Sequence, residues 1–126
     1  MNKETTCFFT GHRIIPKSAK EILRNRLKDN IIKLIEEHDV DTFISGGALG
    51  FDTIAAETVI DIRNEYPNIK LKMYLPCYGQ SKRWNYENQY KYRLIVSNAD
   101  EVIYIVKRNY TNDCMKLRNI KMIWDS

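Results

Sequence analysis

Short apolar runs rich in β-prone residues alternate along this chain with longer stretches of helical periodicity, and this alternation constrains the fold more than any other feature. Strands are expected over residues 6–10, 41–45, 69–75 and 101–106. Helices are expected between and after them. Strands and helices that alternate at these lengths indicate right-handed βαβ units, hence an α/β fold with a mainly parallel sheet of four to five strands. A chain of 126 residues, 44% of them hydrophobic, is expected to form one domain, residues 1–126.

Each expected helix is marked by a cap or an apolar stripe. Ser18 and Glu21 have capping-box spacing, and the helix after them carries one stripe: Leu23, Leu27, Ile31, Leu34 and Ile35. The helix over 52–65 is expected to face the sheet with Ile54, Ala55, Val59 and Ile62. Ser81 is expected to cap a third helix that contains Trp84. The last helix, 113–124, has three apolar residues at helical spacing: Leu117, Ile120 and Trp124.

The third strand is expected at an edge of the sheet. Its apolar residues alternate with Lys70, Lys72 and Tyr74. Parallel strands that are covered on both faces have continuous apolar runs instead, so the alternation predicts a strand with one solvated face.

Composition and charge narrow the classes of partner. The formal net charge of +4 suits an anion, and the scattered lysines and arginines favour a small phosphate ligand over nucleic acid. Three widely separated cysteines, Cys7, Cys77 and Cys114, indicate reduced thiols rather than disulfides or a zinc site, so no metal and no cofactor are expected. No apolar stretch approaches the roughly 20 residues that span a bilayer and no signal peptide is recognisable, so we expect a cytoplasmic protein without a membrane partner.

Two loops at the carboxyl ends of the first two strands are candidate ligand sites. The first is Thr10-Gly11-His12-Arg13, and the second contains Ser45, Gly46, Gly47, Ala48, Gly50 and Asp52. Glycines let backbone N–H groups approach a phosphate, and the following helix presents its positive end to the same anion. The alternative is a tight strand-to-helix turn without a ligand. The loop is neither a P-loop nor the dinucleotide G-x-G-x-x-G fingerprint, so its spacing alone identifies no ligand.

Single side chains near these loops have two interpretations each. Arg13 is a candidate for a bidentate phosphate contact. His12 is a candidate base, or a hydrogen-bonded loop residue. Asp52 is a candidate for a ribose hydroxyl contact, although a carboxylate is favoured at a helix start by the helix dipole alone. Tyr78 and Trp84 are candidates for stacking on a base, or for ordinary packing.

Together these residues resemble the YpsA-like branch of the SLOG superfamily. The resemblance is carried by the loop 10–13 and by Gly46-Gly47-Ala48-Leu49-Gly50-Phe51-Asp52 with Ala55-Ala56-Glu57. Leu75-Pro76, Trp84-Asn85, Glu87-Asn88-Gln89 and Ala99-Asp100 extend it over residues 6–122. It implies a Rossmann-like three-layer fold that binds a nucleotide or a nucleotide-derived signal.

Some relatives, the Lonely Guy enzymes, cleave nucleoside monophosphates. Met115, Arg118 and Met122 fit their M-x-x-R-x-x-x-M helix, so the resemblance implies that Arg118 approaches a ligand phosphate. Their second loop, P-G-G-x-G-T-x-x-E, and its catalytic glutamate have no counterpart in this sequence, so no catalytic residue is assigned. Two alternatives stay open: phosphoribohydrolase (N-glycosidase) activity with Asp52 or Glu57 as the acid, and single-stranded nucleic-acid binding.

The favoured hypothesis is non-catalytic binding. A stand-alone binder would act as a sensor or would sequester a cyclic nucleotide or ADP-ribose-type signal, as a viral anti-defence protein would. An uncovered sheet edge, implied by the missing second loop and its strand, predicts a homo-oligomer, a dimer or higher. Gly47→Asp is expected to abolish binding and to leave the fold largely intact.

Overall fold

The computed structural model describes residues 5–108 and 111–126; residues 1–4 and 109–110 of the expected single domain lie outside this range. The described residues form a four-stranded parallel sheet in the order β1-β2-β3-β4. The strands are β1 (Thr6–Phe8), β2 (Thr42–Ser45), β3 (Lys70–Cys77) and β4 (Glu101–Val106). The helices are the 3₁₀ helix η2 (Lys17–Ala19), α1 (Lys20–His38), α2 (Phe51–Ile62), α3 (Tyr86–Asn98) and α4 (Cys114–Asp125). The predicted α/β, Rossmann-like fold with a parallel sheet is confirmed.

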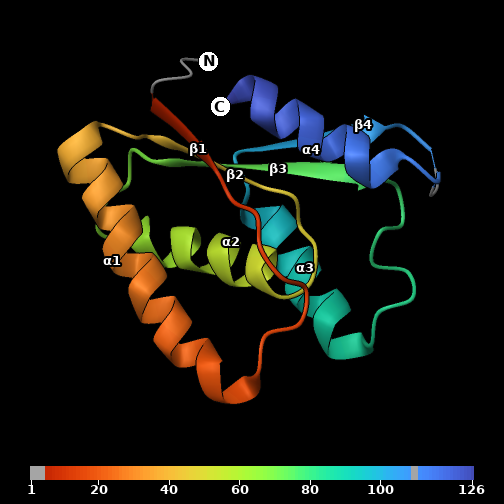
Figure 1. The fold of residues 1–126 in the computed structure, drawn as a ribbon, viewed down its shortest axis with the longest axis horizontal. Helices are drawn as coiled ribbons and strands as arrows, with labels where there is room; N and C mark the ends of the chain where they lie inside the picture. Colours follow the sequence, from red (N-terminus) through yellow and green to blue (C-terminus); the bar gives the residue numbers. More distant parts are fainter. Residues whose placement is uncertain (1–4, 109–110) are drawn as a thin grey trace.

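Three layers result from the order of the strands (Figure 1). Because the strands lie side by side in chain order and crossovers are right-handed, α1, α2 and α3 cover the same face of the sheet. Within residues 5–108 and 111–126, α4 is the single helix on the opposite face, where it contacts β1, β3 and β4. Among the described residues, no helix combines the length and the apolar character needed to cross a bilayer.

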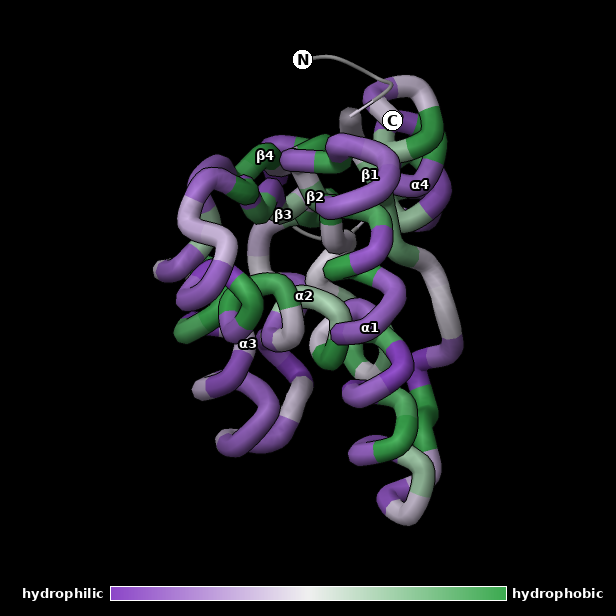
Figure 2. The backbone as a smooth tube through the Cα atoms, turned by 90° about the vertical axis from the view of Figure 1, so that its left-hand side faces the viewer, coloured by the Kyte–Doolittle hydropathy of each residue, from purple (hydrophilic) through white to green (hydrophobic). Residues whose placement is uncertain are grey.

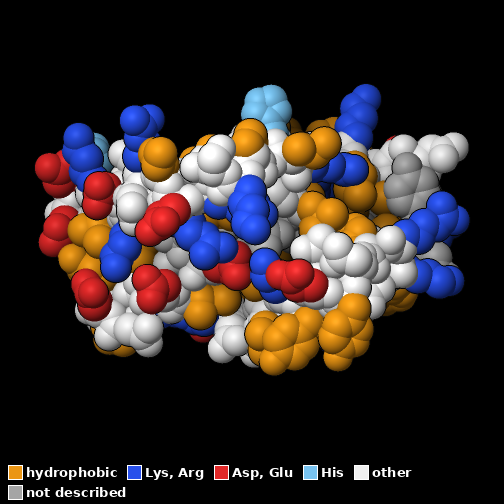
Figure 3. Space-filling model, turned by 90° about the horizontal axis from the view of Figure 1, so that it is seen from below, with side chains coloured by type: hydrophobic (Ala, Val, Ile, Leu, Met, Phe, Trp, Pro, Cys, Tyr) orange, Lys and Arg blue, Asp and Glu red, His pale blue; other side chains and the backbone are white. Residues whose placement is uncertain are grey.

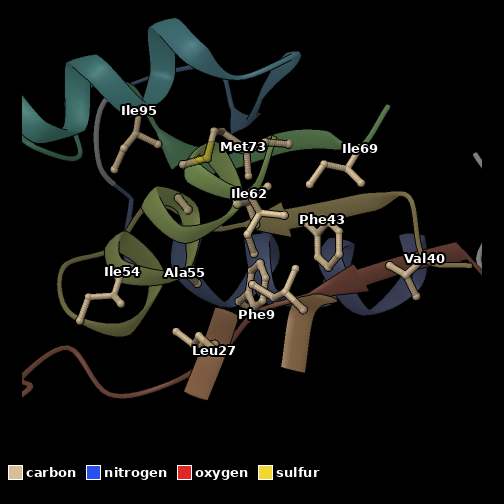
Figure 4. Packing of buried hydrophobic residues seen from close by; sticks show 14 of the residues in the cluster. Phe9, Leu27, Val40, Phe43, Ile54, Ala55, Ile62, Ile69, Met73 and Ile95 are labelled. Carbon is tan, nitrogen blue, oxygen red and sulfur yellow. The ribbon is translucent and has the colours of Figure 1, made fainter. Parts of the chain in front are cut away.

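The main core lies between the sheet and the three-helix layer. Phe9 stacks on Phe43 with ring centroids 5.9 Å apart, and α2 and α3 contribute Ile54, Ala55, Ile62 and Ile95 (Figure 4). The four residues expected to face the sheet from α2 are all buried, as are Leu27 and Ile31 of α1. Because α2 packs between α1 and α3, it is the most hydrophobic of the three helices, whereas both neighbours carry many hydrophilic residues (Figure 2).

The prediction that the third strand is an edge strand is wrong, because β3 pairs with both β2 and β4. Its polar residues face the side of the sheet that only α4 covers. There Lys72 forms an ion pair of 3.1 Å with Glu101, and the Tyr74 hydroxyl donates to Asp125 Oδ2 at 2.6 Å. The alternation therefore reflects a thinly covered face and not a free edge.

Both predicted caps are also wrong. Ser18 lies within η2, and α1 begins after Ala19 without a side-chain cap. The helix α3 begins after Asn85, whose side chain accepts a 2.8 Å hydrogen bond from the Asn88 N–H, so Ser81 and Trp84 precede the helix. In α4 the residues at helical spacing, Leu117, Ile120 and Trp124, are exposed, and the stripe that packs on the sheet is Cys114, Arg118 and Met122.

Candidate functional site

Two loops meet at the carboxyl end of the sheet, as the sequence predicts. The Phe51 N–H donates to the His12 carbonyl at 2.9 Å, which ties the loop 10–13 to the turn after β2. At Gly50, which has a φ of +78°, a β-carbon would lie 2.2 Å from the Arg13 carbonyl oxygen. Only glycine tolerates both that backbone angle and that approach. Thr10, Gly11, His12 and Arg13 are all exposed beside this junction.

The turn itself is held by two of its own side chains. The Ser45 hydroxyl donates to the Asp52 carbonyl at 3.0 Å and accepts from the Gly47 N–H at 3.2 Å. The Asp52 carboxylate accepts from the Ala48 N–H at 3.3 Å. These bonds engage the amides of Gly47 and Ala48. Within the described residues 47–53, the N–H groups of Leu49, Gly50, Asp52 and Thr53 are left without a protein acceptor, whereas the Phe51 N–H is engaged by the His12 carbonyl.

Arg118 reaches the turn from α4, on the far face of the sheet. Its side chain is buried, its Nη1 donates to the Gly46 carbonyl at 2.7 Å, and its Nε donates to Asn119 Oδ1 at 2.8 Å. A β-carbon on Gly46 would lie 2.5 Å from that Nη1, so glycine here makes room for the guanidinium. The structure therefore brings Arg118 to the glycine turn.

Arg13, Asp52 and Arg118 form an electrostatic cluster at this edge. Burial raises the pKa of Asp52, and the charges of Arg118 and Arg13 oppose that rise. Burial lowers the pKa of Arg118, and Asp52 opposes that fall. Two guanidinium groups against one carboxylate give the cluster a net positive charge, which suits an anionic ligand.

Beyond the glycine turn lies a group of four aromatic side chains, called the aromatic group below: Tyr78, Trp84, Tyr92 and Tyr104. Tyr78 packs edge-on against Tyr104 with centroids 4.7 Å apart, and Trp84 packs edge-on against Tyr92 at 5.3 Å. Gln80 lies between this group and Gly47, and its Nε2 donates to the Tyr92 hydroxyl at 3.4 Å. Sequence reasoning missed Gln80 and Tyr92. Gln80 is followed by three other polar residues before Trp84, so the sequence offers no signal that singles it out.

Glu57 lies at the edge of the site, because it lines a small pocket together with Leu49 and Gly50 of the turn. It accepts a 3.2 Å hydrogen bond from Arg24 and lines a cavity of about 570 Å³ between α1 and α2. The layer of α1, α2 and α3 carries intermixed acidic and basic side chains, as the view from below shows (Figure 3). The turn that holds Asp52 is not part of that cavity.

Gly47 is less permissive than the sequence suggests. It has a φ of +72°, and a β-carbon there would lie 2.8 Å from Leu75 Cδ2. Gly47→Asp would strain the backbone and place a carboxylate against Leu75 and Met73, so we expect this variant to lose stability as well as binding. Within the described part of the chain, no group of three or more His, Cys, Asp or Glu residues is arranged to hold a metal ion.

Comparisons with known proteins give a consistent result. Residues 14–123 match the YpsA family, described as the YspA SLOG family. A UPF0398 protein of Staphylococcus haemolyticus is 35% identical over 102 residues, which cover 75% of this chain and 54% of that protein. A UPF0398 protein of Brevibacillus brevis is 35% identical over 89 residues (71% and 47%), and one of Bacillus cereus is 34% identical over 100 residues (79% and 54%). The chain thus spans about half the length of these relatives. It belongs to the YpsA family of SLOG proteins.

Proposed function

We propose that this protein binds a nucleotide-derived small molecule at the turn 46–50 without catalysing a reaction. The observation that carries the proposal is the position of Arg118, which is buried, charged and bonded to the Gly46 carbonyl. Arg118 lies next to the turn that precedes α2. A buried guanidinium beside the N-terminus of a helix, together with a second arginine, attracts a phosphate strongly. Membership of a nucleotide-related family supports the same ligand class.

The phosphate would be held by charge and by backbone amides together. Arg13 is exposed beside the turn, and Arg118 reaches the turn from α4, on the opposite face of the sheet. The N–H groups of Leu49, Gly50, Asp52 and Thr53 would supply neutral donors at the positive end of the helix dipole. In this arrangement Asp52 braces the turn through Ala48 and partly offsets the two arginines.

The carboxyl groups favour binding over glycosidic-bond cleavage. A general acid must lie within hydrogen-bond reach of the leaving group. Asp52 is buried and accepts a hydrogen bond from Ala48, while Glu57 is paired with the guanidinium of Arg24. Neither carboxyl group is therefore placed as a free acid beside the turn.

The aromatic group would contact the rest of the ligand. Tyr78 is 43% exposed and lies after β3, so it offers a surface to a base. Trp84 is already packed on Tyr92, which favours its structural role. A cyclic nucleotide or an ADP-ribose-type molecule fits an anionic site with an aromatic rim, and the protein would act as its sensor or its sequestering agent.

The decisive experiment is mass spectrometry of small molecules released by heat from the purified protein, followed by thermal-shift titration with AMP, ADP-ribose and cyclic nucleotides. Wild-type protein should be stabilised by at least one of them. Arg118→Met should lose the shift, while the matched control Arg63→Met should keep it, because Arg63 pairs with Asp100 at the opposite end of α2. No shift with any of these molecules, or equal shifts in both variants, would contradict the proposal. Salt-dependent binding of an oligonucleotide in their place would favour the nucleic-acid alternative.

A further inference from the structure

Gln80 carries the single buried side-chain oxygen or nitrogen atom that lacks a hydrogen-bond partner among the described residues: its carbonyl oxygen, Oε1. Buried polar atoms in folded proteins are almost always bonded, because leaving one unsatisfied costs free energy that the fold must offset elsewhere. An atom of this kind beside a binding site is a candidate acceptor for a donor that arrives with the ligand.

Gln80 brings its carboxamide group next to the glycine turn. A β-carbon on Gly47 would lie 3.3 Å from Gln80 Nε2. The same Nε2 donates to the Tyr92 hydroxyl at 3.4 Å, and Tyr92 in turn packs against Trp84. The carboxamide thus lies between the turn and the aromatic group, and its oxygen is the end without a protein partner.

We propose that Gln80 Oε1 accepts a hydrogen bond from a ribose hydroxyl of the bound nucleotide. The inference rests on the proposed function, because it takes the phosphate to lie at the turn 46–50. The group joined to a nucleotide phosphate is the sugar, whose hydroxyls are donors, and the base lies one step further on. Asp52, the residue expected to contact ribose, commits its Oδ2 to the Ala48 N–H, whereas Gln80 Oε1 has no such commitment.

The test is a thermodynamic cycle in which the side chain at position 80 and the ribose hydroxyls of the ligand are removed separately and together. Dissociation constants of AMP and of 2′,3′-dideoxy-AMP are measured by calorimetry for wild-type protein and for Gln80→Met, which fills a similar volume with an apolar side chain. We expect wild-type protein to bind AMP about tenfold more tightly than the dideoxy analogue, the value of one neutral hydrogen bond. Gln80→Met should bind the two ligands equally.

Gln89→Met is the matched control, because Gln89 donates only to the carbonyls of Ser81 and Lys82. It should keep the preference for AMP even if the loop before α3 loosens. Loss of the preference in this control as well, or an equal preference in wild-type protein and Gln80→Met, overturns the assignment of Gln80. Failure of wild-type protein to bind AMP, ADP-ribose and cyclic nucleotides alike instead contradicts the proposed function itself.

Discussion

The guanidinium of Arg118 donates to the carbonyl of Gly46 at 2.7 Å, which joins two residues that lie 72 positions apart in the chain. Arg118→Met leaves that carbonyl without its donor and removes a positive charge beside Asp52. We expect the free energy of unfolding to fall by about 1–3 kcal/mol and ligand affinity to fall by at least tenfold. Arg118→Lys, which keeps the charge but not the planar fork, should give intermediate values. Urea denaturation and calorimetry measure the two effects, and unchanged affinity in Arg118→Met would exclude a ligand contact.

The two glycines that flank the turn should respond differently to alanine. At Gly46 the new methyl group meets the end of the Arg118 side chain, which can move, so Gly46→Ala should weaken binding with a loss of stability below about 2 kcal/mol. At Gly50 it meets the Arg13 backbone at a positive φ, and the destabilisation should be larger. Thermal denaturation of both variants checks the order. The reverse order would show that the junction of the two loops is not rigid.

Glu57→Gln separates the binding and enzyme hypotheses. Glu57 and Arg24 are partly exposed, and exposed ion pairs contribute about 0–1 kcal/mol. We therefore expect a change in unfolding free energy within that range, unchanged ligand affinity and no base release from AMP in either protein. Base release by wild-type protein that is lost in this variant would instead support a phosphoribohydrolase.

Local patterns predicted the order of elements, the two glycine loops and the side of α2 that is buried. These features depend on periodicity and on loop residues, which a sequence displays directly. The centrality of β3 was not predicted, because the sequence does not reveal that one helix alone covers one face of the sheet. Lys72 and Tyr74 are accommodated there by Glu101 and Asp125, which lie far away in the chain.

Some residues of the candidate site could be predicted from the sequence, and others became visible only in the structure. Gly46 and Gly50 were identified by spacing, and Arg118 by a resemblance to relatives. Gln80 became a candidate only through its surroundings, since an unpartnered oxygen is a property of packing and not of sequence. The engagement of the Gly47 and Ala48 amides by Ser45 and Asp52 likewise depends on side-chain geometry.

Cys77 should be protected from alkylation in the folded protein. Burial and a hydrogen bond with Cys114 raise the pKa of the Cys77 thiol from 9.0 to about 11. Two pKa units lower the thiolate fraction at pH 8 by about a hundredfold, and burial slows access further. Because the thiol stays protonated up to a higher pH in the folded state than in the unfolded state, the free energy of unfolding should fall as the pH rises from 9 to 11. Mass spectrometry after iodoacetamide treatment, with and without urea, measures the protection; equal labelling in both conditions would contradict it.

Self-association should use the exposed stripe on α4, if the expected homo-oligomer forms. Leu117 and Ile120 are 39% and 41% exposed on the helix that lies alone on its face of the sheet. Apolar side chains at this spacing on an uncovered helix are typical of helix–helix contacts. We expect wild-type protein to sediment as a dimer or a higher oligomer, and the Leu117→Ser/Ile120→Ser variant to sediment as a monomer with an unchanged circular dichroism spectrum. Lys116→Ser on the same helix is the control and should still associate. An oligomer that persists in the double variant would place the interface elsewhere, with the outer strands β1 and β4 as the next surfaces to test.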